Sequence, residues 1–328
     1  MSTGRLLVTE RRNGLFRLAG WLAAIVVGVY VARALGAGLS DLGAHELPEH
    51  LGWSQILGSG VLFLIAHAVL VQTWRSVLAC WEARLGFWTA ARIWSVSNLG
   101  KYVPGKVWQI GAMSAMSRDV GVSPIAAAGS AILGTLVNVF AGFVVLLASG
   151  RELLERARPG WGALAVTIVV IAGGALILAP WIIPRLAPVV AKLAGRPLGT
   201  TLPMRAVVYS LAGNVLAWLI YGAAFQLLVH GLLGRSAGGY SQYLAAYTIS
   251  YLFGYLAVFA PAGVGVRELV MLKALEIAGL ASAPQAALVT IVSRIWLTLL
   301  EVTPGFLFWA HHRARRRSLT IDPSDAQT

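Results

Sequence analysis

The chain has 328 residues, of which 58% are hydrophobic and 12% are charged, and its formal net charge is +13. A soluble domain carries about a quarter charged residues, so this composition excludes an ordinary soluble globular protein. The basic residues stand at the ends of apolar segments, which favours contact with anionic lipid head groups over binding of nucleic acid.

In chain order, six apolar segments are long enough to cross a bilayer core about 30 Å thick. They are Leu15–Leu35, Ile56–Leu78, Ile125–Leu147, Trp161–Trp181, Ala206–Leu233 and Ala286–Trp309. We expect the first to be retained as a span, because it is longer than the apolar core of a signal peptide and further spans follow it. The sequence therefore predicts an all-α polytopic membrane protein.

Two further apolar stretches are each interrupted by a proline–glycine motif. Phe87–Met116 is broken at Pro104-Gly105, and Tyr240–Leu280 is broken at Pro261-Ala262-Gly263. Proline removes a backbone donor and glycine permits a positive φ, so each break is expected to end one half-helix and to start another.

The placement of basic residues predicts the orientation of these segments. The N-terminal segment, the loop Pro180–Arg205 and the stretch Arg313–Arg317 are basic and are expected in the cytoplasm, whereas the acidic loop after the first span is expected outside. These assignments agree only if each broken stretch enters and leaves on one side. The first is then a re-entrant hairpin from the cytoplasm, and the second is one from the outside.

The same order of segments recurs in two halves, residues 1–150 and 151–312, which are followed by a basic and polar tail, 313–328. Each half has two spans, a hairpin and a span, and the halves have opposite orientations. A weak echo supports the repeat, since Gly121 lies 17 residues beyond Pro104 and Gly279 lies 18 beyond Pro261. Inverted repeats whose broken helices meet near the midplane are a recurrent transporter design.

The first break is the most informative motif. The half-helix that begins near Lys106 would offer free N–H groups and a positive dipole end to an anion, and Lys101 and Lys106 add full charges. The alternative is an interfacial turn whose lysines reach lipid phosphates and whose Tyr102 and Trp108 anchor it at the membrane surface.

The second break repeats the design, with Arg267 and Glu268 in the first turn of the following half-helix. Glu268 is electrostatically favourable there and is explained equally well as a cap. Arg267 is unfavourable at a positive helix end unless an anion meets it, so we interpret it as a candidate ligand for an anion.

Arg294 and Glu301 lie seven residues apart, about two helical turns, and so share one face of the last span. Charges inside a span usually face the protein interior. Structural pairing of Arg294 with Glu268 or of Glu301 with Arg267 is one interpretation, and direct contact with a substrate is the other. Glu301 is also a candidate carboxylate for proton coupling.

The two motifs resemble those of the lysylphosphatidylglycerol synthase transmembrane-region family, which is also described as flippase-like. Gly100–Trp108 is similar to its Gly-Lys-Tyr-x-Pro-Gly-Lys-x-Trp signature, and Pro261–Glu268 is similar to its Pro-Gly-Gly-x-Gly-x-Arg-Glu signature, with Ala262 in place of a glycine. Arg294 matches an arginine of that family's last span. The resemblance covers nearly the whole chain and implies an inner-membrane protein that moves lipids or lipid-linked precursors between leaflets.

We therefore expect a lipid flippase of the bacterial inner membrane, with both termini in the cytoplasm, for an anionic phospholipid or a polyprenyl-phosphate-type lipid. The candidate ligands of the head group are Lys101, Tyr102, Pro104, Gly105, Lys106, Trp108, Gly263, Gly265, Arg267, Glu268 and Arg294.

Two alternatives stay open: a non-transporting subunit that scaffolds a lipid or glycan biosynthetic enzyme, and an intramembrane lipid-phosphate transferase. The sequence shows no metal-ligand spacing, phosphate loop, dinucleotide fingerprint or nucleophile elbow, so we expect no metal, cofactor or catalytic residue. The aminoacyltransferase domain of the full-length synthases is not in the sequence, so lipid aminoacylation is not expected. A second copy of the chain or a biosynthetic enzyme is the protein partner we consider.

Overall fold

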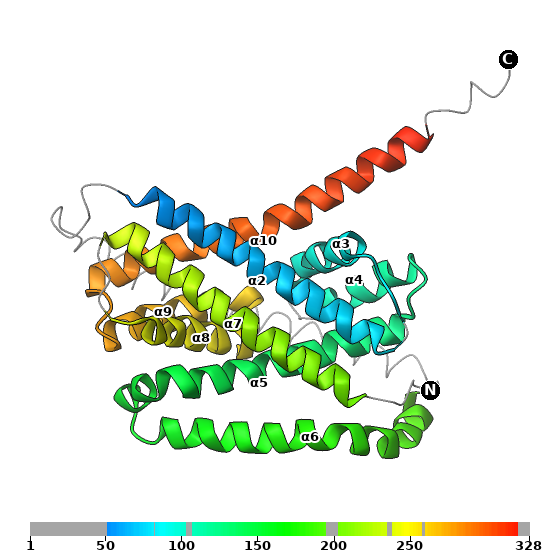
Figure 1. The fold of residues 1–328 in the computed structure, drawn as a ribbon, viewed down its shortest axis with the longest axis horizontal. Coiled ribbons are helices and arrows are strands. Elements are labelled where there is room, and N and C mark those ends of the chain that lie inside the picture. The colour runs from blue at the N-terminus through cyan, green and yellow to red at the C-terminus, as the bar shows by residue number, and fades with distance from the viewer. Residues whose placement is uncertain are drawn as a thin grey trace, which may run out of the picture.

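A computed structural model describes residues 51–81, 83–102, 107–194, 203–234, 238–257 and 260–320. Its long helices are α2 (Trp53–Ala79), α5 (Pro124–Ala157), α6 (Trp161–Ala194), α7 (Met204–Leu233) and α10 (Ala283–Thr320) (Figure 1). Each of the five contains an apolar stretch long enough to cross a membrane. The predicted all-α polytopic architecture is therefore confirmed for these segments, while the predicted span Leu15–Leu35 lies outside the described residues.

Both interrupted stretches form two shorter helices on either side of a break. The first hairpin consists of α3 (Phe87–Asn98), the 3₁₀ turn η2 (Leu99–Tyr102) and α4 (Val107–Arg118). The second consists of α8 (Tyr240–Leu256), the 3₁₀ turn η3 (Pro261–Gly263) and α9 (Val266–Ile277). The two arms of each hairpin pack against each other. Described helices thus flank both predicted motifs, and Pro104-Gly105 of the first lies outside the described residues.

Three long helices continue beyond the ends that hydropathy predicts. α6 ends at Ala194 instead of Trp181, and α10 at Thr320 instead of Trp309. α5 has a kink at Gly150 (φ −131°, ψ 19°) and continues beyond it to Ala157 instead of ending at Leu147. Hydropathy marks only the part of a helix that suits lipid, whereas the flanking arginine, glutamate and lysine residues are good helix formers. The beginning of the predicted tail, 313–328, is therefore helical.

The long helices are arranged in antiparallel pairs. The N–H of Gly52, just before α2, donates to the carbonyl of Gly231 near the end of α7 at 2.8 Å. α5 packs on α6, which runs in the opposite direction (Figure 1). The first arm of each hairpin packs on the last long helix of the other half, α3 on α10 and α8 on α5. An inverted repeat would produce such reciprocal packing, and the repeat itself stays a prediction.

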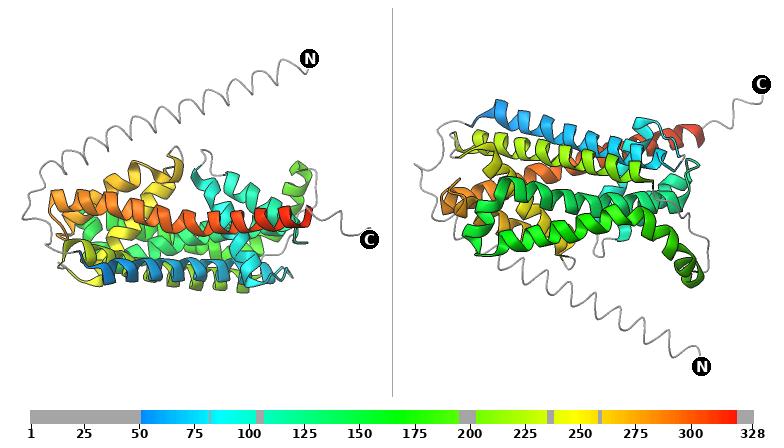
Figure 2. Two further views of the ribbon diagram at one scale, coloured as in Figure 1. Left: turned by 90° about the horizontal axis from the view of Figure 1, so that it is seen from above. Right: turned by 60° about the horizontal axis from the view of Figure 1, so that its bottom comes forward.

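The two hairpins enter from opposite ends of the bundle, and their described inner ends approach each other about halfway along its length (Figure 2). The turns η2 and η3 are in contact, although about 160 residues separate them in the sequence. The fold therefore brings together the two motifs that the sequence singles out.

Glycines allow α2 and α7 to approach closely. A Cβ atom on Gly231 would lie 2.9 Å from the carbonyl oxygen of Gly52 and 3.1 Å from the nitrogen of Ile56. These are backbone atoms and cannot rotate away. Small residues at such interfaces let helix backbones approach each other within a membrane.

We predict that Gly231→Ala lowers the free energy of unfolding by about 1–3 kcal/mol relative to Gly174→Ala, because the added methyl group must push α2 and α7 apart. A Cβ atom on Gly174 of α6 meets nothing within 4 Å, so this control shares only the gain in helix propensity. The single cysteine, Cys80, is buried, and the reaction of its thiol with a maleimide during heating in detergent therefore reports unfolding. Equal unfolding midpoints for the two variants would contradict the prediction.

Candidate functional site

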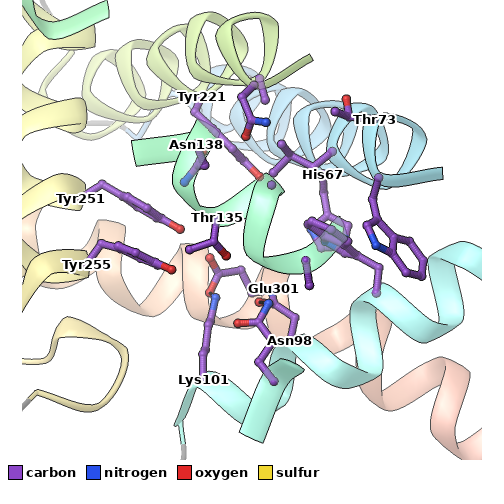
Figure 3. Close-up of a pocket in the computed structure, with 18 of the residues that line it drawn as sticks. His67, Thr73, Asn98, Lys101, Thr135, Asn138, Tyr221, Tyr251, Tyr255 and Glu301 are labelled. Carbon is purple, nitrogen blue, oxygen red and sulfur yellow. Dashed lines mark hydrogen bonds and ion pairs between the residues drawn. The ribbon is translucent and has the colours of Figure 1, made fainter. Parts of the chain in front are cut away.

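A cavity of about 340 Å³ lies where the two breaks meet. Every described helix except α6 contributes to its wall, and η2 and η3 contribute Lys101, Ala262 and Gly263. Figure 3 shows Lys101 and Glu301 near each other in this wall, with Tyr251 and Tyr255 beside them. Its volume is at the lower end of the range of about 300–1,000 Å³ for small-molecule sites. The cavity is therefore a candidate binding site formed by segments that are far apart in the sequence.

The cavity extends from the middle of the bundle toward one end. On α2 its lining runs from His67, near the midpoint of the helix, to Val77 near the C-terminal end. On α7 it runs from Ser210, near the N-terminal end, to Tyr221, just past the midpoint. The opposite halves of these two helices are packed with buried apolar side chains, among them Ile56, Phe63, Phe225 and Leu228. The cavity thus lies on the side from which the first hairpin enters.

Lys101 and Tyr102 hold the first break to the last long helix. Lys101 Nζ lies 2.5 Å from Glu301 Oε2, and the hydroxyl of Tyr102 donates to the same oxygen at 3.0 Å. The side chains of Lys101 and Glu301 are 23% and 13% exposed, so both charges are largely removed from solvent. Glu301 therefore pairs with Lys101 and not with Arg267, which corrects one of the two pairings that the sequence suggested.

Arg294 anchors the second break to the same helix. Its Nε lies 2.9 Å from Glu268 Oε1, and its Nη2 donates to the carbonyl oxygen of Ala262 at 3.0 Å. The other carboxylate oxygen of Glu268 accepts the N–H of Gly265 at 2.6 Å. The suggested pairing of Arg294 with Glu268 and the capping role of Glu268 are both present. The N–H of Gly265 is consequently not free to bind an external anion.

The second break has a backbone conformation that favours glycine. Ala262 has φ +49°, and Gly263 and Gly265 have φ +72° and +89°. The left-handed conformation costs a residue with a Cβ atom about 1–2 kcal/mol, so the hydrogen bond from Arg294 to Ala262 stabilises a strained turn. A Cβ atom on Gly263 would lie 2.8 Å from Cα of Gly254, and only glycine fits there.

Arg267 lies in the cavity wall between aromatic rings. The residue is 8% exposed. Its guanidinium carbon lies 5.5 Å from the ring centre of Tyr247 and 5.0 Å from that of Tyr251. Within the part of the chain that the structure describes, Arg267 forms no ion pair with a carboxylate. Aromatic faces stabilise a buried cation, but far less than a carboxylate does. This arginine is the feature of the site that best fits an anionic ligand.

The charges of the cavity do not balance. Among the described residues, its charged lining side chains are Lys101, Arg267, Arg294 and Glu301. Their charges sum to +2 when all four are ionised. If Glu268, which pairs with Arg294, is counted as well, the sum is +1. A wall with an excess of one sign, shielded from water, attracts ions of the opposite sign.

The structure brings most of the predicted ligands together. Lys101, Gly263, Arg267 and Arg294 line the cavity, as does Glu301, the candidate coupling carboxylate. Three others, Tyr102, Gly265 and Glu268, are hydrogen-bonded around it. Trp108 is 56% exposed near the start of α4 and does not line the cavity. Pro104, Gly105 and Lys106 lie outside the described residues.

Sequence reasoning missed the aromatic wall of the cavity. Tyr243, Tyr247, Tyr251 and Tyr255 recur every fourth residue along α8 and therefore share one face. The last three line the cavity, whereas Tyr243 is fully buried in the core. The repeat is visible in the sequence, but tyrosines at helical spacing do not distinguish a cavity wall from a packed core.

No protein-family model matches the chain, and no curated protein matches it in sequence. The resemblance of the two motifs to a family therefore stays an expectation. What the site does has to be inferred from its geometry.

We predict that Glu301→Gln lowers the free energy of unfolding by about 2–3 kcal/mol, because it leaves the charge of Lys101 without a partner in a largely buried position. The double variant with Lys101→Met should recover much of the lost free energy of unfolding, since the second substitution removes the unpaired charge. The double-mutant cycle is measured by chemical unfolding in detergent, with the Cys80 thiol as the reporter. Strictly additive effects of the two substitutions would contradict a direct pair.

The matched control is Glu152→Gln. Glu152 pairs with Arg156 on α5, and their side chains are 75% and 53% exposed. An exposed pair of this kind contributes little, so the change in unfolding free energy should stay within about 0.5 kcal/mol. A loss as large as that of Glu301→Gln would show that the assay does not resolve the buried pair.

Proposed function

We propose that this protein is a lipid transporter that moves an anionic, phosphate-bearing lipid across the bacterial inner membrane. The observation that carries the proposal is Arg267, a buried cation without a carboxylate partner among the described residues, in the wall of a cavity between two opposed hairpins. Broken helices that meet at such a site are a recurrent feature of secondary transporters.

The phosphate of the lipid would bind beside Arg267. A guanidinium presents a rigid fork of donors to phosphate, and charge-assisted hydrogen bonds are about twice as strong as neutral ones. Lys101 and Arg294 line the same cavity and are already engaged with Glu301 and Glu268. An entering phosphate would compete with these carboxylates, so binding would loosen the contacts that hold both breaks to α10. A Glu301 released in this way would be free to take up a proton.

Transport requires a second arrangement in which the site faces the opposite leaflet. The cavity lies on one side of the breaks, and the other side is packed. α3 packs on α10 in the way that α8 packs on α5. If each half adopted the conformation that the other half has now, the cavity would close on its present side and open on the opposite side. The sequence contains no phosphate loop, so transport would be passive, coupled to an ion, or driven by consumption of the lipid.

The orientation follows from charge. Arg84 before α3, Arg118 at the end of α4 and Arg205 at the start of α7 lie at the end toward which the cavity extends. An excess of arginine in short loops favours the cytoplasmic side. The described arrangement would then face the cytoplasm.

We predict that the purified protein, reconstituted into phosphatidylcholine vesicles, moves fluorescent phosphatidylglycerol between leaflets faster than protein-free vesicles do. Arg267→Gln should slow this movement about tenfold or more, because loss of a hydrogen bond to a charged group costs about 1.5–3 kcal/mol. The rate is measured with a membrane-impermeant quencher that is added outside the vesicles.

Lys273→Gln is the matched control on α9, because Lys273 is 58% exposed and pairs only at the surface with Glu276. Its transport rate should equal that of the unmodified protein. No lipid movement by the unmodified protein, or equal rates for the Arg267 and Lys273 variants, would refute the proposal. A covalently altered lipid in the vesicles would favour the intramembrane transferase instead.

A further inference from the structure

Away from its charged side chains, the cavity wall consists of aromatic rings and uncharged polar groups. Representative members are Trp94 and Asn98 of α3, Asn138 of α5, and Trp218 and Tyr221 of α7. A phosphate needs donors and positive charge, which Lys101, Arg267 and Arg294 already supply. The remaining wall is therefore available to some other part of a ligand.

The aromatic rings of this wall are held in fixed positions. The indole N–H of Trp218 donates to the backbone carbonyl of Asn138 at 3.1 Å. The rings of Trp218 and Tyr251 meet edge to face with centres 5.1 Å apart, and those of Tyr221 and Tyr247 lie 5.9 Å apart. Rings fixed by their neighbours lose little conformational freedom when a ligand packs on them.

Several polar groups of the wall are left for a ligand. In the segments that the structure describes, the side-chain amide of Asn138 and the hydroxyl of Tyr221 hydrogen-bond to no other residue, although both line the cavity. Asn98 accepts from Gln109 through its oxygen at 3.3 Å, which leaves its own amide protons available. Polar groups inside a protein are costly unless water or a ligand satisfies them.

Such a wall matches the chemistry of a hydroxylated ring. The hydroxyl groups of a sugar or of inositol both donate and accept hydrogen bonds, as an asparagine amide does, and the C–H faces of the ring pack on aromatic side chains. Resting on the transport function proposed above, we infer that the transported lipid carries a phosphate joined to a hydroxylated six-membered ring. The phosphate binds at Arg267, and the ring binds between Asn138 and Tyr221.

The size of the cavity agrees with this assignment. At about 340 Å³ it accommodates a small-molecule head group, whereas a phosphate alone would leave the aromatic wall uncovered. The hydrocarbon chains stay in the bilayer. The cavity therefore does not distinguish a glycerophospholipid with an inositol head group from a polyprenyl phosphate that carries a sugar, because both present the same phosphate and ring.

The test compares transport of three labelled lipids in reconstituted vesicles: phosphatidylinositol, a polyprenyl-phosphate-linked glucose, and phosphatidic acid, which lacks the ring. We expect at least one of the two ring-bearing lipids to move about tenfold faster than phosphatidic acid. Movement of phosphatidylinositol alone assigns a glycerophospholipid, and movement of the prenyl lipid alone assigns a polyprenyl carrier. Equal rates for all three lipids would overturn the inference while leaving the transport function in place.

Two variants test the residues. Asn138→Leu and Tyr221→Phe should each lower the ratio of ring-lipid to phosphatidic acid transport about three- to tenfold, because each removes a hydrogen bond to a hydroxyl group. The matched control for Tyr221→Phe is Tyr209→Phe, which lies on α7 as well. Tyr209 is 52% exposed and does not line the cavity. An unchanged ratio in both cavity variants would contradict the assignment of the ring to this wall.

If no lipid moves at all, a binding measurement tests the proposed ring site independently of the proposed transport function. In detergent, inositol 1-phosphate should raise the unfolding temperature reported by Cys80 more than glycerol 3-phosphate does, and Asn138→Leu should abolish the difference. That result would support the ring site although transport had failed. Equal effects of the two phosphates on the unmodified protein would overturn it.

Discussion

Non-helical backbone can lie within a membrane bundle only where protein or water satisfies its polar groups, and two such segments determine this structure. Both breaks are held by one helix. Glu301 of α10 binds Lys101 and Tyr102 of the first break, and Arg294, two turns earlier, binds Glu268 and the Ala262 carbonyl of the second. The two turns therefore meet at a fixed place, and the cavity lies between them.

The anchors of the breaks are also the charges of the site. Lys101 and Arg294 line the cavity while each is paired with a carboxylate, whereas Arg267 lines it beside the rings of Tyr247 and Tyr251 and forms no ion pair among the described residues. An anion that binds Arg267 would alter the pairs on either side. The proposed mechanism links occupancy of the site to the stability of both hairpins in this way, since the same groups serve binding and architecture.

Close helix packing gives the bundle its rigid part. α2 and α7 approach each other through glycines near both ends of the pair, Gly231 beside Gly52 and Gly213 beside Thr73. The hairpins pack on α5 and α10 around this pair. Since α2 belongs to the first half and α7 to the second, this pair joins the two halves, and the proposed rearrangement would move the hairpins against it.

Hydropathy and proline–glycine chemistry are local properties, and so the sequence by itself determined the five described spans, the helices on either side of the two motifs and the shared face of Arg294 and Glu301. Only the tertiary structure decided which charges meet. Glu301 binds Lys101 instead of Arg267, Trp108 stays outside the cavity, and the tyrosines of α8 form its wall together with Asn138. These outcomes depend on how far each helix is rotated and shifted against its neighbours, and packing between distant segments sets that rotation.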